Sequence, residues 1–204
     1  MADTRGLILD AAERLYAERG LDGVSLRQIT EAAGQRNNAA VHYHFGGRDG
    51  LVRALFEQRY AHLEERRAAM LATLLEEGRA DDLAGLVRVL VAPFTEAAGE
   101  DEHWVRFVAR LHEDPRFNPF SAPEPYGAGA QATEASRDVT ARIRARLGLP
   151  VEAANVRFYL VTTMVVHAVA DRQAMATAGV GERLPTGEQL LDALVEAAVA
   201  VFTR

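Results

Sequence analysis

Apolar residues recur every three to four positions along the chain, and this spacing constrains the fold more than any other feature of the sequence. One such run extends from Leu7 to Tyr16, and a longer one extends from Leu51 to Leu74. No alternation of apolar and polar residues is long enough to indicate a β-strand. The sequence therefore predicts an all-α protein.

Capping residues, glycines and prolines mark where the predicted helices begin and end. Asp3 or Thr4 can cap the first helix, and Gly20 can close it. Ser25 begins a second, short helix with a capping box. Further helices are expected at about residues 36–43, 48–77, 82–98, 102–112, 130–147, 151–177 and 186–203, with a loop at 114–127 that holds four of the seven prolines.

The predicted helices divide into a small head and a larger body. The first three are short and form a three-helix head at residues 1–47. The long helix that begins at Arg48 joins this head to a helical body, which we place at residues 48–204.

The charge is unevenly distributed along the chain. The net charge is -6, yet residues 1–60 carry eight arginines and eight acidic residues, so the body supplies the whole excess of negative charge. A neutral head on an acidic body is compatible with binding of nucleic acid by one end of the protein.

The chain contains no cysteine, which excludes disulfides and thiolate metal sites. The first ten residues lack the layout of a signal peptide. The most apolar stretch, Val156 to Ala170, is interrupted by polar residues, and we expect it to be too short and too polar to span a bilayer. A cytoplasmic protein without a membrane-bound part is therefore expected.

Two short helices joined by a turn at Gly34 are typical of a helix-turn-helix, whose second helix presents polar groups to base edges. Arginine can donate two hydrogen bonds to guanine, and Gln or Asn can pair with adenine. The candidates for reading bases are Gln35, Arg36, Asn37 and Asn38. The candidates for contacting phosphates are Ser25, Arg27, His42, Tyr43 and Arg48.

The stretch from Leu7 to Leu55 resembles the DNA-binding head of the TetR family of transcription regulators. The matching pieces, in the family's order, are Ile8-x-x-Ala11-Ala12-x-x-Leu15-Tyr16, Glu18-Arg19-Gly20, Ser25-Leu26-x-x-Ile29, Ala32-Ala33-Gly34, Tyr43-His44-Phe45 and Arg48-Asp49-Gly50-Leu51. The resemblance implies a dimeric regulator, usually a repressor, that binds palindromic operator DNA and is released by a small-molecule effector.

The head departs from the family pattern in three places. The interval from Gly34 to Phe45 is one residue longer than usual, His42 stands where the family usually has tyrosine, and Arg48 replaces the usual lysine. Purely structural roles compete with DNA contacts at several positions. Ser25 can serve only as a cap, Arg27 can be a solvated surface charge, and Phe45 is expected in the core of the head.

For the body, the resemblance implies a ligand pocket between helices and a dimer interface formed by the last two helices. Val156 to Ala170 is apolar on nearly every side, so this helix needs partners all round, as in a four-helix bundle of two subunits. The candidates for binding a small, mostly apolar ligand are Phe94, Trp104, Phe107, His112, Tyr126, Met164 and His167. The candidates for the dimer interface are Tyr159, Val166, Leu191, Leu194, Val195 and Ala198.

Two other interpretations remain open. An all-helical ligand-binding protein or enzyme without DNA function would fit the composition, although the sequence lacks the common catalytic motifs, and we expect no enzymatic activity, no cofactor and no metal. His103, His112, Glu113 and Asp114 match no standard metal-ligand spacing. A helix-turn-helix protein of another family would lack a ligand-sized cavity in the body.

Overall fold

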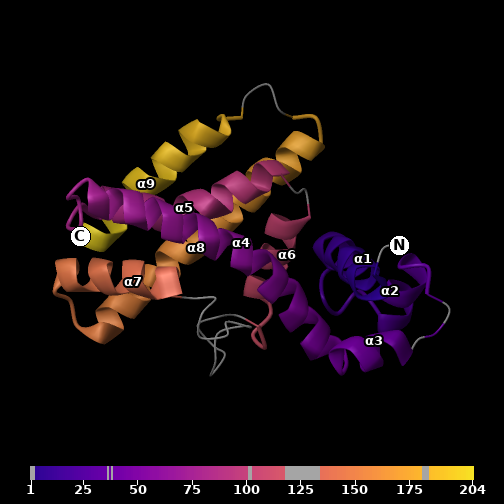
Figure 1. Ribbon diagram of the computed structural model, residues 1–204. Helices are drawn as coiled ribbons and strands as arrows, with labels where there is room; N and C mark the ends of the chain where they lie inside the picture. The colour runs from indigo at the N-terminus through magenta and orange to yellow at the C-terminus, as the bar shows by residue number, and fades with distance from the viewer. Residues whose placement is uncertain (1–2, 36, 38, 101–102, 118–133, 181–183) are drawn as a thin grey trace. The chain divides into compact units, whose positions relative to one another are not determined.

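A computed structural model describes residues 3–35, 37, 39–100, 103–117, 134–180 and 184–204. These residues form nine helices and no β-strand, which confirms the predicted all-α class (Figure 1). The helices are α1 (Thr4–Arg19), α2 (Leu26–Ala32), α3 (Ala39–Phe45), α4 (Arg48–Glu76), α5 (Leu83–Glu100), α6 (Trp104–Glu113), α7 (Glu134–Leu147), α8 (Val151–Thr177) and α9 (Gly187–Thr203).

The helices pack into two compact units. The N-terminal unit comprises Met1–Tyr60 and His103–Ala128, and the second unit comprises Ala61–Glu102 and Gly129–Arg204. Helix α4 begins in the N-terminal unit and continues into the second unit. These two units are defined by contacts between residues, and they differ from the predicted head and body, which meet after residue 47. The predicted boundary separates two functions, and it stays a prediction.

Helix α1 is the centre of the N-terminal unit and packs against both α2 and α6. The side chain of Asp3 caps its first turn, and Ile8, Ala12 and Tyr16 are fully buried along one face. Glu13 is also buried, and Arg59 of α4 neutralises it through two hydrogen bonds of 3.0 and 3.1 Å. A buried carboxylate of this kind is stable only when it is paired, so the Glu13–Arg59 pair fixes α4 against α1.

Helix α3 begins at Ala39, three residues later than predicted, and it includes Phe45. The cause lies at Asn37, whose side chain accepts a hydrogen bond from the backbone N–H of Ala39 at 2.9 Å. Asparagine favours such contacts ahead of a helix over a place inside it. At the other end, Gly46 and Gly47 have φ values of 75° and 130°, which only glycine adopts easily.

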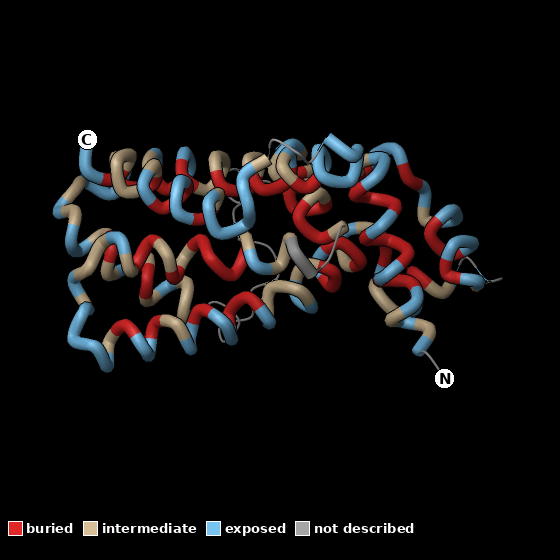
Figure 2. The backbone as a smooth tube through the Cα atoms, turned by 90° about the horizontal axis from the view of Figure 1, so that it is seen from above, coloured by how far each residue is buried: buried red, intermediate tan, exposed pale blue. Residues whose placement is uncertain are grey.

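The core of the second unit lies around α5, which packs against α7, α8 and α9. Buried and exposed residues alternate at helical spacing along these helices, as Figure 2 shows. On α9, the fully buried residues Ala198 and Phe202 are four positions apart, and Phe158 of α8 contacts Phe202 with ring centroids 4.9 Å apart. These apolar faces supply the main driving force for folding of this unit.

A buried ion pair joins three helices of the second unit. Glu64 and Arg67 of α4 are each only 6% exposed and lie 2.6 Å apart. Glu64 also accepts hydrogen bonds from the backbone N–H and hydroxyl of Ser136, at the start of α7. Arg67 donates to the carbonyl of Leu90 in α5. Since both charges are satisfied, this network fixes α4, α5 and α7 together.

Helix α8, which contains the apolar stretch Val156 to Ala170, extends beyond it at both ends and is 27 residues long. By length and composition, α8 is the one described helix that could cross a membrane, and 39% of its most apolar window is buried inside the protein. Core helices of water-soluble proteins share these properties, and α8 packs against α5 and α9.

Candidate nucleic-acid interface

Helices α2 and α3, with the turn between them, form the predicted helix-turn-helix of the N-terminal unit (Figure 1). The turn begins at Gly34, where a φ of +69° reverses the chain direction. The backbone N–H of Gln35 then donates to the carbonyl of Thr30 at 2.8 Å, which closes the end of α2. This left-handed geometry explains why glycine follows α2.

The capping box predicted at the start of α2 is present. The hydroxyl of Ser25 accepts from the backbone N–H of Gln28 at 3.2 Å, and the Gln28 side chain accepts from the backbone N–H of Ser25 at 2.8 Å. Arg27 is exposed and lies 2.7 Å from Glu31, one turn along the same helix. Ser25 therefore has a structural role, and Arg27 is a surface charge with an acidic neighbour.

Of the four candidates for reading bases, the structure describes two. Gln35 is half-buried and donates to the carbonyl of Ala33 at 3.2 Å. Asn37 is exposed, and its side-chain oxygen accepts the hydrogen bond that starts α3. Arg36 and Asn38 lie outside the described residues. The two described side chains therefore both support the local fold.

Helix α3 presents its most exposed side chains in its second half. Val41 is its one described buried residue, whereas His42 is exposed and Tyr43 is 85% exposed. A tyrosine combines an aromatic ring with a hydroxyl, and this combination is enriched at interfaces. Phe45, which is expected in the core of the head, is only half-buried, and so is His44.

Arg48, a predicted phosphate contact, has a structural role within the N-terminal unit. Its two terminal nitrogens donate to the carbonyls of Leu21 and Val24, the latter at 2.7 Å. Its guanidinium also lies 5.9 Å from the ring centroid of Tyr16. Arginine suits this position because its planar fork can serve two carbonyls at once, so Arg48 positions the loop at residues 21–24 that leads into α2.

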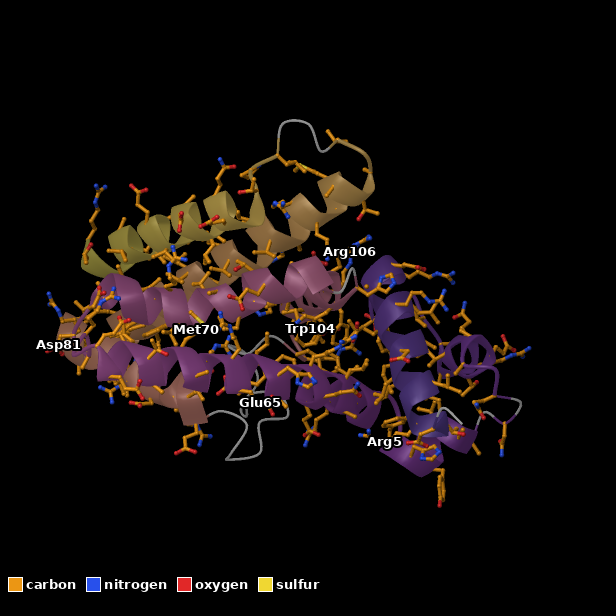
Figure 3. All side chains as sticks on the ribbon, turned by 45° about the horizontal axis from the view of Figure 1, so that its top comes forward. Arg5, Glu65, Met70, Asp81, Trp104 and Arg106 are labelled. Carbon is orange, nitrogen blue, oxygen red and sulfur yellow. The ribbon has the colours of Figure 1, made fainter. Side chains whose placement is uncertain are left out.

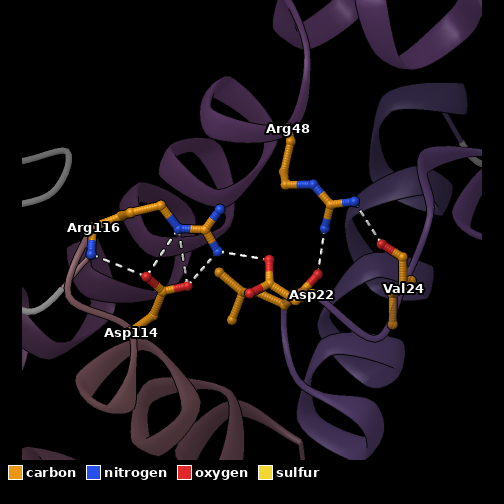
Figure 4. A network of polar contacts seen from close by, with 6 residues as sticks. Asp22, Val24, Arg48, Asp114 and Arg116 are labelled. Atoms are coloured by element: carbon orange, nitrogen blue, oxygen red, sulfur yellow. Dashed lines mark hydrogen bonds and ion pairs between the residues drawn. The ribbon is translucent and has the colours of Figure 1, made fainter.

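The same loop is contacted from the other side by Arg116, which follows α6 (Figure 4). Arg116 donates to Asp22 at 2.7 Å and to Asp114 at 2.5 to 3.2 Å. These hydrogen bonds hold the pKa of Asp114 below the usual carboxyl range. The side chain of Phe117, the next residue, is fully buried. The loop before α2 is therefore held by α4 and by the end of α6.

Two of the ligand candidates, Trp104 and Phe107, are fully buried in an aromatic cluster of the N-terminal unit. Their ring centroids lie 5.8 Å apart, and the cluster continues to Phe56 of α4 and to Tyr16 of α1. His112 is half-buried in the same unit. In the second unit, Phe94 is buried and Met164 and His167 are half-buried, while Tyr126 lies outside the described residues.

A surface pocket of the N-terminal unit lies between α1 and the end of α2. None of the ligand candidates lines it, and its lining residues are Leu7, Asp10, Ala11, Arg14, Ala32, Ala33 and Gly34. Among the described residues, no group of three or more histidine and acidic side chains is placed to hold a metal ion.

The candidates for the dimer interface lie mostly inside the chain's own core. Tyr159 is 40% exposed, but the other five are at most 8% exposed within a single subunit, namely Val166, Leu191, Leu194, Val195 and Ala198. Among the exposed apolar residues of the second unit, Val156 and Leu160 lie on α8 close in sequence to Tyr159. The sequence predicts a place in the interface for Tyr159 but not for Val156 or Leu160, because a broad apolar face does not show which partner covers it.

Arg5 in α1 is a second surface feature that the sequence reasoning missed. It is exposed, and its guanidinium lies 5.5 Å from the ring centroid of Phe45, the last residue of α3 (Figure 3). The position of Arg5 in the first turn of a predicted helix was the one signal in the sequence. A cation in the first turn of a helix opposes the helix dipole, so an arginine there indicates another role.

The family model of bacterial regulatory proteins, tetR family, matches residues 8–55. The transcriptional repressor AcnR of Corynebacterium efficiens is 32% identical over 85 residues, which are 42% of this chain and 41% of AcnR. The transcriptional regulator TtgR of Pseudomonas putida is 31% identical over 94 residues, 46% of this chain and 42% of TtgR. The matched segment thus spans about two fifths of these relatives.

Solved structures share the fold over nearly the whole chain. A tetR family transcription regulator of Shewanella sp. PV-4 superposes with a TM-score of 0.64 at 15% identity and covers 98% of this chain and 96% of its own. FadR of Bacillus subtilis, in complex with stearoyl-CoA, superposes with a TM-score of 0.56 at 16% identity, covering 96% of this chain and 98% of its own. The match at residues 8–55 confirms the predicted resemblance of this segment to the TetR family of bacterial regulatory proteins, and the solved structures share the fold of the chain.

Proposed function

We propose that this protein is a cytoplasmic transcription regulator that binds operator DNA through α3 and acts as a repressor. The observation that carries the proposal is the exposure of two neighbouring side chains of α3, His42 and Tyr43, of which Tyr43 is 85% exposed, on a helix anchored by the buried Val41. The repressor role of the relative AcnR favours the same role here. An enzyme has less support, since the matching family model and relatives are transcription regulators.

The proposed contacts divide into those that read bases and those that bind phosphates. Base reading is assigned to the start of α3 and the residues before it, at positions 35–38. Phosphate contacts are assigned to Tyr43 and His42, with Ser25 and Arg27 at the start of α2. Arg48 serves the interface by positioning the loop at residues 21–24, because its terminal nitrogens already donate to two carbonyls.

We further propose that the protein acts as a homodimer through α8. Tyr159 and Leu160 lie three and four positions after Val156, so both share one side of the helix with it. Val156, Tyr159 and Leu160 are 58%, 40% and 49% exposed, which leaves an apolar strip that a second copy can cover. A two-fold dimer presents two copies of α3 and therefore reads a palindromic operator.

A small, mostly apolar effector is proposed to release the protein from its operator. FadR, which shares the fold, is known in complex with stearoyl-CoA, a ligand with a long apolar chain. Helix α6 contains the single tryptophan, Trp104, and packs against α1. A ligand that displaces α6 would therefore also affect the rest of the N-terminal unit. Such a ligand releases the protein if it binds the DNA-free state more tightly than the DNA-bound state.

Selection of duplexes from a random-sequence pool by the purified full-length protein tests the proposed function. At about 0.1 M salt, we expect one palindromic sequence to be enriched, with half-sites whose centres lie about 10 base pairs apart or a multiple of that distance. A pool that stays unenriched after several rounds would contradict operator binding. Enrichment of a site without two-fold symmetry would retain DNA binding but contradict the proposed dimer.

A further inference from the structure

Arg5 is exposed at the start of α1, beside the end of α3 (Figure 3). Its guanidinium carbon lies 5.5 Å from the centroid of the Phe45 ring. A cation over an aromatic face is held by the ring's negative face and keeps its full charge. Phe45 therefore fixes the position of the Arg5 side chain without neutralising it.

The carboxylate nearest to Arg5 in sequence is occupied elsewhere. Asp3 accepts a hydrogen bond from the backbone N–H of Arg5 at 3.3 Å, as the cap of α1. Within the part of the chain that the structure describes, the Arg5 guanidinium forms no ion pair with a carboxylate. By contrast, Arg27 at the start of α2 lies 2.7 Å from Glu31. Arg5 thus presents an unneutralised positive charge.

A series of ring contacts connects Arg5 with the most exposed residue of α3. The Tyr43 ring contacts His44 edge-on at a centroid distance of 5.0 Å, and His44 contacts Phe45 at 6.0 Å. Arg5 covers the Phe45 ring at the end of this series. These contacts place Arg5 and Tyr43 at the two ends of one series of neighbouring rings.

We infer that Arg5 is a further DNA contact, which donates to a backbone phosphate beside the one bound by Tyr43. This inference rests on the proposed function. A phosphate at this position would neutralise the Arg5 charge, which the dipole of α1 otherwise disfavours in its first turn. Because phosphates are the same at every base pair, the contact adds affinity without sequence preference.

The test measures the dependence of DNA affinity on salt concentration for full-length variants. Arg5→Ala is compared with the wild type on a selected duplex and on a scrambled duplex of equal length. Loss of one phosphate contact should lower the slope of log affinity against log salt by about one. At 0.1 M salt, this corresponds to a roughly five- to tenfold weaker affinity for both duplexes. Arg5→Lys keeps the charge and should restore most of the slope.

Arg19→Ala is the matched control, because Arg19 is an exposed arginine at the far end of α1, about 21 Å away along the helix axis. It should leave the slope unchanged. If Arg5→Ala lowers the melting temperature but leaves the slope as in the wild type, Arg5 only supports Phe45 and the inference is overturned. An unchanged slope and melting temperature also overturn it. If the wild type binds neither duplex, the proposed function itself fails, which is a different result.

Discussion

The guanidinium of Arg116 lies 2.7 Å from the carboxylate of Asp22, which is 94 positions earlier in the sequence (Figure 4). The contact joins the residue that follows α6 to the loop that leads into α2. Arg48 donates to the carbonyls of Leu21 and Val24 in the same loop. The approach to the helix-turn-helix is therefore held by two arginines from distant parts of the N-terminal unit.

Asp114 orients Arg116 toward Asp22, and its contribution to stability should depend on pH. Hydrogen bonds from Arg116 lower the pKa of Asp114 in the folded protein. A lowered carboxyl pKa stabilises the fold above the pKa of the unfolded chain, about 4, and this contribution is lost as the pH falls through the folded value. We expect Asp114→Asn to reduce stability at pH 7 and to make stability less sensitive to pH below 4.

Urea denaturation followed by circular dichroism between pH 3 and 7 measures this effect. Asp81→Asn is a suitable control, because Asp81 is an exposed carboxylate outside helix α5. An Asp114→Asn variant that follows the wild-type pH curve in parallel would show that Asp114 is not the titrating group.

Tyr16 has a fully buried side chain whose hydroxyl has no hydrogen-bond partner among the described residues. Burial raises the pKa of Tyr16 to about 12. Since an unsatisfied buried hydroxyl costs free energy, Tyr16→Phe should leave stability unchanged or raise it by about 1 kcal/mol. The neutral hydroxyl is favoured in the fold, so the wild type should lose stability between about pH 10 and 12, and the variant should lose less.

Tyr43→Phe removes an exposed hydroxyl and is compared with Tyr16→Phe, which removes a buried one. Tyr43 is 85% exposed, so removing its hydroxyl should leave the melting temperature unchanged but weaken DNA binding. Calorimetric melting and a DNA titration of both variants check the pair. Weaker DNA binding by Tyr16→Phe at unchanged stability would instead assign the buried hydroxyl a role in the interface.

Arg48→Ala should destabilise the N-terminal unit, because it leaves the carbonyls of Leu21 and Val24 without their charged donor. A hydrogen bond to a charged group contributes about 1.5–3 kcal/mol, and partial exposure reduces this figure. Arg48→Lys should restore only part of the stability, since an ammonium lacks the planar fork. Urea denaturation measures both variants. Equal stability of all three proteins would show that these hydrogen bonds contribute little.

The proposed dimer surface and the core of the second unit can be separated by two substitutions to glutamate. Leu160 is 49% exposed on α8, so Leu160→Glu should give a folded monomer. Leu194 of α9 is only 4% exposed within one subunit, so Leu194→Glu buries an unpaired charge and should unfold the chain. Light scattering and circular dichroism distinguish these results. A dimeric Leu160→Glu protein would place the interface on another surface.

Local signals in the sequence were sufficient to predict most helices. The cap at Asp3 and the capping box at Ser25 and Gln28 set the starts of α1 and α2, and α8 begins and ends at the predicted residues. Each of these capping contacts joins residues that are at most three positions apart, so a local sequence pattern is enough to predict it. The start of α3 was misplaced because Asn37 serves as a cap, although the helical spacing allowed it inside the helix.

The candidate site depended on contacts that no local pattern encodes. Arg48 looked like a phosphate contact from its place in the family pattern, but its hydrogen bonds go to residues 24 and 27 positions earlier. Leu194 and its neighbours were assigned to a second subunit because an apolar helix face looks the same whichever partner covers it. In both cases the packing within one chain shows contacts that the sequence pattern does not encode.

Operator recognition by α3 is the central claim, and fluorescence anisotropy of labelled duplexes across a range of salt concentrations tests it most directly. The protein should bind its selected palindrome at least about 1,000-fold more tightly than a scrambled duplex of equal length at about 0.15 M salt. Both affinities should fall steeply as salt increases, because phosphate contacts release counterions. Equal affinity for the two duplexes, or no binding even at about 0.05 M salt, would contradict the account.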